Sequence, residues 1–103
     1  MSGRDDSGGA SDRHEAEYEI RNELGLHVRA AAILVRTAGR YRSEVVLAIG
    51  DREADARSVL DLLTLAASKG TRVVVRAVGP DARDAVDGVG GCIARKFAES
   101  DDV

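Results

Sequence analysis

The sequence has almost no aromatic residues: tryptophan is absent, and two tyrosines and one phenylalanine make up 3% of the 103 residues. Modules that bind single-stranded nucleic acid stack bases on aromatic side chains, so this composition argues against such a function. The formal net charge of −3 gives no general attraction to nucleic acid or to an anionic membrane. Hydrophobic residues still make up 44% of the chain, so the core must be built from Val, Leu, Ile and Ala.

Cysteine is also scarce, because Cys92 is the single one in the sequence. One thiol excludes an internal disulfide and a cysteine-based zinc site, and it fits a reducing compartment. No apolar run approaches the length that spans a bilayer, and the N-terminus lacks the apolar core of a signal peptide. We therefore expect a cytoplasmic protein that does not insert into a membrane. We also expect a monomer that holds no metal ion and no cofactor.

The length of the chain suffices for one small domain and is too short for two. Residues 1–14 are mostly Gly, Ser, Asp and Arg, with almost nothing apolar. Such a composition cannot bury enough surface to offset the entropy of ordering, so it predicts a mobile N-terminal tail. Residues 15–103 are the predicted domain. His14 falls within the predicted tail, and we expect it to be solvated and without a function.

Hydrophobic periodicity divides the predicted domain into seven elements. Alternating or β-branched apolar residues, with a hairpin signal at Gly50-Asp51, predict strands over 15–21, 44–49, 52–55 and 72–78. Helical spacing predicts helices over 28–38, 58–67 and 81–98. The order β-α-β-β-α-β-α predicts an α+β fold, an open-faced β-sandwich. In it, a four-stranded, mostly antiparallel sheet carries three helices on one face.

Two of the predicted helices have features that bear on packing. The expected apolar stripe of the first helix consists of Val28, Ala31, Ala32, Val35 and Ala38. The last helix contains three glycines, each about 1 kcal/mol less favourable than alanine in a helix interior. They are Gly88, Gly90 and Gly91. We expect this helix either to depend on packing or to bend at that point.

The stretch Gly25-Leu26-His27-Val28-Arg29-Ala30-Ala31 places a histidine and an arginine two residues apart, where a helix begins after a glycine turn. A helix N-terminus offers unpaired backbone N–H groups and the positive end of a dipole, so it binds anions readily. A neutral imidazole nitrogen can attack phosphorus. The stretch therefore predicts a site that carries a phosphoryl group on His27. By itself it leaves a second interpretation, in which His27 is a polar helix cap.

Three signatures in register resemble the HPr family, the histidine-containing phosphocarriers of the bacterial phosphoenolpyruvate-dependent phosphotransferase systems. They are Gly25-Leu26-His27-Val28-Arg29, Arg57-Ser58-Val59-Leu60-Asp61-Leu62-Leu63-Thr64-Leu65 and Lys69-Gly70-Thr71, and the resemblance runs from about Ala16 to Phe97. It implies that His27 accepts a phosphoryl group on Nδ1 from enzyme I and passes it to an enzyme IIA-type acceptor. Arg29 would assist with charge-assisted hydrogen bonds. Such a protein is a carrier without turnover of its own.

The sequence departs from the family pattern at Ala30, where relatives typically have proline in the first helical turn. Proline at the first helical position fixes φ and removes an N–H that has no helical partner. Alanine keeps this N–H, which either adds a donor for the phosphate or loosens the start of the helix.

Ser58 is a second candidate site, at the head of the predicted short helix. In many family members a serine here is phosphorylated by HPr kinase/phosphorylase, and a phosphate dianion is favoured at a helix N-terminus. Serine is equally a preferred N-cap that needs no kinase. Both interpretations of Ser58 stand at this point.

Apolar residues follow Ser58 on the same helix. In the family, residues matching Val59, Leu60 and Leu63 belong to the docking surface for enzyme I and other partners. A modest apolar patch with a polar rim is typical of a transient interface. The alternative is that these side chains pack into the core.

Three functions therefore compete. The first is a phosphoryl carrier, which the presence of His27 and Arg29 favours. The second is a regulatory binding module controlled by phosphorylation at Ser58, for which the imidazole would be unnecessary. The third is a stable but inactive domain, which Ala30 alone suggests.

Overall fold

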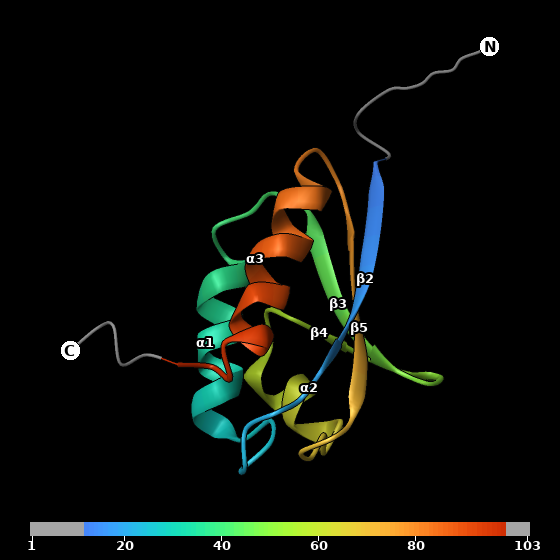
Figure 1. Ribbon diagram of the computed structural model, residues 1–103. Helices are drawn as coiled ribbons and strands as arrows, with labels where there is room; N and C mark the ends of the chain where they lie inside the picture. Colours follow the sequence, from blue (N-terminus) through green and yellow to red (C-terminus); the bar gives the residue numbers. More distant parts are fainter. Residues whose placement is uncertain (1–11, 99–103) are drawn as a thin grey trace.

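In the computed structural model of this chain, which describes residues 12–98, four strands form one sheet and three helices cover one of its faces (Figure 1). The elements are β2 (Arg13–Glu19), α1 (Val28–Ala38), β3 (Glu44–Ile49), β4 (Arg52–Asp55), α2 (Val59–Thr64), β5 (Arg72–Val78) and α3 (Ala82–Ala94). The strands lie in the order β2-β5-β3-β4, and neighbours pair antiparallel. The predicted open-faced α+β sandwich and its element order are confirmed.

The first strand begins two residues earlier than the sequence predicts. Arg13 and His14 pair with Val78 and Ala77 of β5, and the Asp12 carbonyl accepts a hydrogen bond from the Gly79 N–H at 2.9 Å. The expected end of the tail at His14 is therefore wrong. Strands pair through their backbone N–H and C=O groups. A strand with polar side chains can therefore continue for as long as the neighbouring strand, here β5, offers backbone partners. Residues 1–11 and 99–103 lie outside the described residues.

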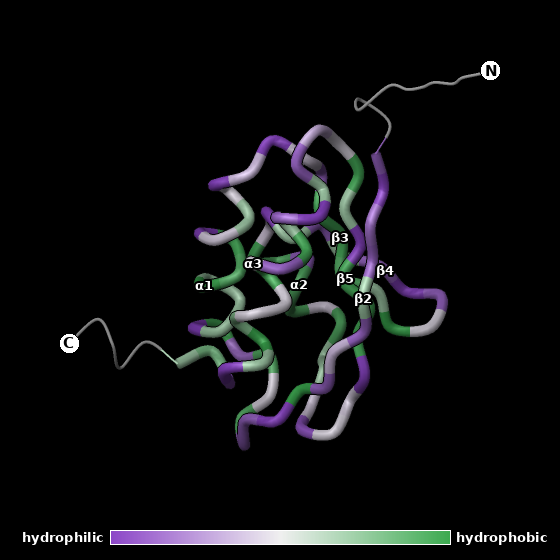
Figure 2. Tube along the Cα trace, turned by 45° about the horizontal axis from the view of Figure 1, so that its top comes forward, coloured by the Kyte–Doolittle hydropathy of each residue, from purple (hydrophilic) through white to green (hydrophobic). Residues whose placement is uncertain are grey.

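The core lies between the sheet and the helices, where hydrophobic segments gather (Figure 2). Helix α1 buries a different set of side chains from the predicted stripe: Ala30, Ala31, Ile33, Leu34 and Ala38. The prediction is wrong at Val28 and Ala32, which are exposed. The large aliphatic pair Ile33 and Leu34 fixes the buried face, because burying a leucine or isoleucine contributes far more free energy than burying an alanine.

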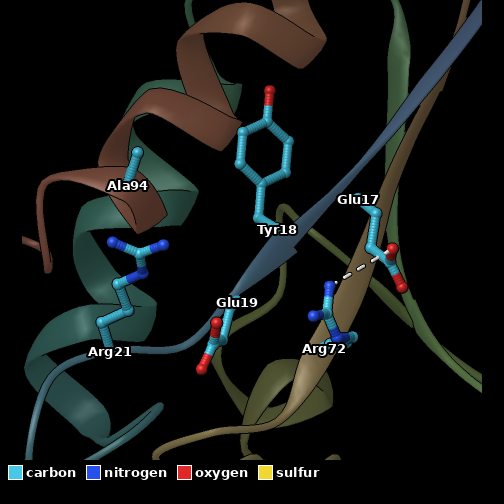
Figure 3. Close-up of a pocket in the computed structure, with 6 residues that line it drawn as sticks. All are labelled: Glu17, Tyr18, Glu19, Arg21, Arg72 and Ala94. Atoms are coloured by element: carbon cyan, nitrogen blue, oxygen red, sulfur yellow. Dashed lines mark ion pairs between the residues drawn. The ribbon is translucent and has the colours of Figure 1, made fainter.

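Glycines of α3 make room for two tyrosine rings. A Cβ atom at Gly90 would collide with the ring of Tyr18, and one at Gly88 would collide with the ring of Tyr41. Figure 3 shows Tyr18 of β2 pointing toward α3, while Glu17 points away and pairs with Arg72 at 3.6 Å. The low helix propensity of these glycines is thus offset by packing, one of the two outcomes that the sequence predicts.

Two helices end earlier than predicted. Helix α2 stops at Thr64 rather than residue 67, because Ala66 has a φ of 49° and the Arg52 guanidinium donates to the Leu65 carbonyl at 3.0 Å. Helix α3 stops at Ala94 rather than residue 98, because Lys96 and Phe97 both adopt positive φ. Left-handed backbone costs about 1–2 kcal/mol for a residue with a side chain, so packing must offset it at these positions.

Candidate functional site

The loop that leads into α1 is held against the segment that follows α2. Gly25 has a φ of 66°, and a Cβ atom there would collide with the Ala67 carbonyl oxygen. The Leu26 N–H donates to this same oxygen at 2.9 Å, and the Asn22 side-chain amide donates to the Gly25 carbonyl at 2.7 Å. Glycine is required here by both the conformation and the close approach. These contacts fix the position of His27 at the N-terminus of α1.

His27 is the N-cap of α1, with extended backbone at φ −88° and ψ 179°. Its Nδ1 accepts hydrogen bonds from the backbone N–H groups of Arg29 at 3.2 Å and Ala30 at 3.3 Å. An accepting Nδ1 carries no proton, so the neutral ring bears its hydrogen on Nε2. The nucleophilic lone pair therefore lies at the N-terminus of the helix, where both the N–H groups and the dipole favour an anion.

His27 and Arg29 line one shallow surface pocket, as the sequence predicts for neighbours on a helix start. The other residues that line it are Asn22, Glu23, Leu24, Lys96 and Phe97. Of the described residues, two cationic side chains and one carboxylate thus share this pocket with the imidazole. An anionic group of the size of a phosphoryl could be bound there by backbone N–H donors and by cations.

Ala30 occupies the third helical position, not the first, because α1 begins at Val28. Its side chain is completely buried, and its N–H donates to Nδ1 of His27. The N–H that proline would lack is therefore used at the imidazole itself. This arrangement favours the interpretation of an added donor over that of a loosened helix start.

Lys96 and Phe97 also line the pocket, although no pattern in the sequence assigns them to it. They follow α3 and lie almost seventy positions from His27, so no local motif connects them with it. The sequence offers one indirect signal. Phe97 continues the apolar stripe of the predicted last helix, so its side chain is expected to be buried near the C-terminal end of that helix. Phe97 is 6% exposed and belongs to the core.

Ser58 lies outside the His27 pocket, as the N-cap of α2. Its hydroxyl accepts a hydrogen bond from the Asp61 N–H at 3.1 Å, whereas the Asp61 carboxylate accepts from the Asp55 N–H at 3.1 Å. The Arg57 guanidinium donates to carbonyls around the end of α1, including that of Ser43 at 3.2 Å. Ser58 therefore lies in a turn with two aspartates, Asp55 and Asp61, whose carboxylates accept backbone hydrogen bonds, and the Arg57 guanidinium is already bound to carbonyl groups.

The predicted docking residues differ in their exposure. Leu60 is 77% exposed, whereas Val59 and Leu63 are partly buried and pack against the core. Helix α2 packs against α1, and the exposed side chains of Leu24 and Val28 flank His27. Exposed apolar side chains thus occur both beside His27 and on the neighbouring helix, as a transient interface requires.

Known proteins resemble this chain over most of its length. The family model described as the HPr component phosphorylation site of the phosphotransferase system matches residues 14–95. Phosphocarrier protein HPr of Cupriavidus necator is 39% identical over 87 residues, which cover 84% of this chain and 98% of that protein. Phosphocarrier protein NPr of Shewanella violacea is 36% identical over 86 residues, covering 84% and 94%.

A solved structure agrees with the sequence relatives. HPr-C-His from Thermoanaerobacter tengcongensis superposes with a TM-score of 0.79 at 32% identity, over 84% of this chain and 97% of that chain. Between residues 12 and 98, no helix is long and apolar enough to cross a membrane. Since the family model and a relative at 39% identity both span most of the chain, this protein belongs to the HPr family of phosphocarriers of the phosphotransferase system.

Proposed function

We propose that this protein carries a phosphoryl group on Nδ1 of His27, accepting it from enzyme I and passing it to an enzyme IIA-type acceptor. The observation that supports this most strongly is the geometry of the helix cap. The unprotonated Nδ1 faces the N–H groups of Arg29 and Ala30 at 3.2 and 3.3 Å. A nucleophilic nitrogen and the donors that stabilise its product thus share one site.

In the accepting step, the Nδ1 lone pair attacks phosphorus and forms the P–N bond. The bond from phosphorus to the donor atom of enzyme I breaks, and that atom keeps the electron pair. The proton on Nε2 stays on the ring while the P–N bond forms. In the second step an acceptor nitrogen attacks, and the electrons of the P–Nδ1 bond return to the imidazole.

The protein's own contribution is positioning and charge stabilisation, because phosphoryl transfer needs little other covalent work. When phosphorus occupies Nδ1, the two N–H groups lose their nitrogen acceptor and can donate to phosphoryl oxygens instead. Arg29 lines the same pocket and adds a positive charge. Replacing Arg29 with alanine should slow transfer by about tenfold or more, the usual effect of a hydrogen bond to a charged group.

Incubation with enzyme I and phosphoenolpyruvate tests the proposal directly. The parent should gain one phosphoryl group that is labile in acid and stable in base, because phosphoramidates hydrolyse in acid. His27→Ala should gain none, while His14→Ala serves as the matched control and should be phosphorylated like the parent. Phosphorylation of the His27→Ala variant would exclude His27 as the acceptor.

A second candidate function is a regulatory binding module controlled at Ser58. It is favoured by the position of this hydroxyl, which caps α2 two residues before the exposed Leu60. A phosphate at Ser58 would add about −1.5 to −2 charges at neutral pH beside an apolar surface. HPr kinase/phosphorylase is the enzyme class that would modify it, and phosphorylation by such a kinase with loss on Ser58→Ala is the corresponding test.

A further inference from the structure

The end of α3 brings a second cation into the His27 pocket. Lys96 and Arg29 both line this pocket, Arg29 from α1 and Lys96 from the turn that follows α3, and these two helices pack against each other. We propose that Lys96 contacts the phosphoryl group on His27 and stabilises its dianionic form. This inference rests on the proposed function, and it assigns a binding role to a residue far from the motif in sequence.

The backbone after α3 holds Lys96 in place. The Lys96 N–H donates to the Ile93 carbonyl at 3.0 Å, and the Phe97 N–H donates to the Cys92 carbonyl at 2.8 Å. These two bonds form a Schellman motif, which normally has glycine at the position of Lys96. Lys96 and Phe97 instead adopt φ values of 60° and 57°. The burial of Phe97 in the core anchors this turn, so Lys96 projects from a fixed point beside the pocket.

Among residues 12–98, the charges around the pocket come from four segments. Arg29 belongs to α1, Lys96 follows α3, Glu23 precedes α1, and Lys69 precedes β5. Lys69 pairs with Glu23 at 2.6 Å and does not line the pocket. The hydrogen bond from Lys69 lowers the pKa of Glu23, and the charge of Lys96 acts in the same direction.

The carboxylate of Glu23 therefore partly neutralises the charge of Lys96 while His27 is unphosphorylated. A phosphoryl dianion on His27 would offer Lys96 a stronger counterion in the same pocket. Because Lys96 is exposed, its effect should be modest. An exposed charge pair changes an equilibrium by about twofold to fivefold, and such a contact stabilises the phosphoryl group without trapping it.

Chemical phosphorylation separates this inference from the identity of the biological donor. In phosphoramidate the P–N bond breaks, ammonia leaves with the electron pair, and phosphorus bonds to the imidazole. The ³¹P resonance of the product is then titrated with pH. His27→Ala shows which signal belongs to His27. The variants are Lys96→Gln, Lys96→Arg, Glu23→Gln and, as a matched control, Lys69→Gln.

Loss of a cation disfavours the dianion, so Lys96→Gln should raise the phosphoryl titration midpoint by about 0.3–0.7 pH unit, a twofold to fivefold gain in proton affinity. Lys96→Arg should restore the parent value, and Glu23→Gln should shift the midpoint the other way. An unchanged midpoint in Lys96→Gln, or an equal shift in Lys69→Gln, would overturn the inference. A parent that takes no label on His27 would overturn the proposed function itself, and this inference with it.

Discussion

At the scale of single residues, His27 combines a structural role with the chemical role that the proposed function gives it. Its Nδ1 caps α1 by accepting from two backbone N–H groups, and the same nitrogen is the proposed nucleophile. Phosphorylation would replace a nitrogen acceptor with phosphoryl oxygens at the same helix end. The cap and the chemistry can therefore be separated by substitutions that keep one and remove the other.

We expect His27→Ala to lose about 0.5–1 kcal/mol of unfolding free energy, because the first turn loses its side-chain cap. His27→Asn should keep most of the stability, since asparagine is among the best N-caps. Neither variant should accept a phosphoryl group. Urea denaturation measures the first effect and enzyme I labelling the second. Equal stability of His27→Ala and the parent would show that the Nδ1 bonds contribute nothing to the helix.

At the scale of the element, the start of α1 depends on the Ala30 N–H. Proline in place of alanine lowers the entropy of the unfolded chain, which stabilises by about 0.4–1 kcal/mol where φ is compatible. It also removes one of the two hydrogen bonds to Nδ1, worth about 0.5–1.5 kcal/mol. We therefore expect Ala30→Pro to gain no more than about 0.5 kcal/mol, or to lose up to about 1 kcal/mol, in thermal or urea unfolding. A full gain of about 1 kcal/mol would mean that the Ala30 N–H has no energetic role.

Helix α2 provides a second prediction at the same scale. Ser58→Ala should lose about 1 kcal/mol, because the hydroxyl accepts from the Asp61 N–H. Ser58→Asn and Ser58→Asp should both keep the cap. If charge at this position controls the carrier, Ser58→Asp should accept phosphoryl groups from enzyme I much more slowly than Ser58→Asn. Equal rates for these two variants would leave Ser58 as a helix cap alone.

At the scale of the whole molecule, the exposed apolar side chains of α2 and beside His27 predict a docking surface for enzyme I, the proposed donor. Leu60 is 77% exposed, whereas Leu63 packs against the core, so the two positions should respond differently to glutamate. Leu60→Glu should weaken association with enzyme I while changing stability by less than about 0.5 kcal/mol, as surface substitutions usually do. Leu63→Glu should also lower stability. Unchanged affinity in Leu60→Glu, measured by calorimetry, would exclude this docking surface.

Much of the fold follows from local sequence patterns. Periodicity and turn residues predict the bounds of α1, β3, β4 and β5. Gly39, Gly50 and Gly79-Pro80 end α1, β3 and β5, and the hairpin turn at Gly50-Asp51 also sets the beginning of β4. The differences arise where tertiary contacts decide. The beginning of β2 depends on the length of β5, and the end of α2 depends on the Arg52 guanidinium.

The candidate site can likewise be predicted where it depends on a local segment, and it cannot where it depends on tertiary contacts. The His27 motif and its helix start can be read from a continuous segment, so the sequence predicts them together. The position of Lys96 in the His27 pocket cannot be predicted in this way, because only folding brings the end of α3 to the start of α1. The position of Ala30 within the helix likewise depends on which residue caps it.

In the proposed function, Nδ1 of His27 and the first N–H groups of α1 form one phosphoryl site. The most direct test is an NMR spectrum of the phosphorylated protein, labelled with ¹⁵N and observed with ³¹P. We predict phosphorus coupling to Nδ1 of His27, together with the largest amide shifts at Arg29 and Ala30. Coupling to Nε2, or amide shifts confined to another part of the molecule, would exclude a phosphoryl site built from Nδ1 and these N–H groups.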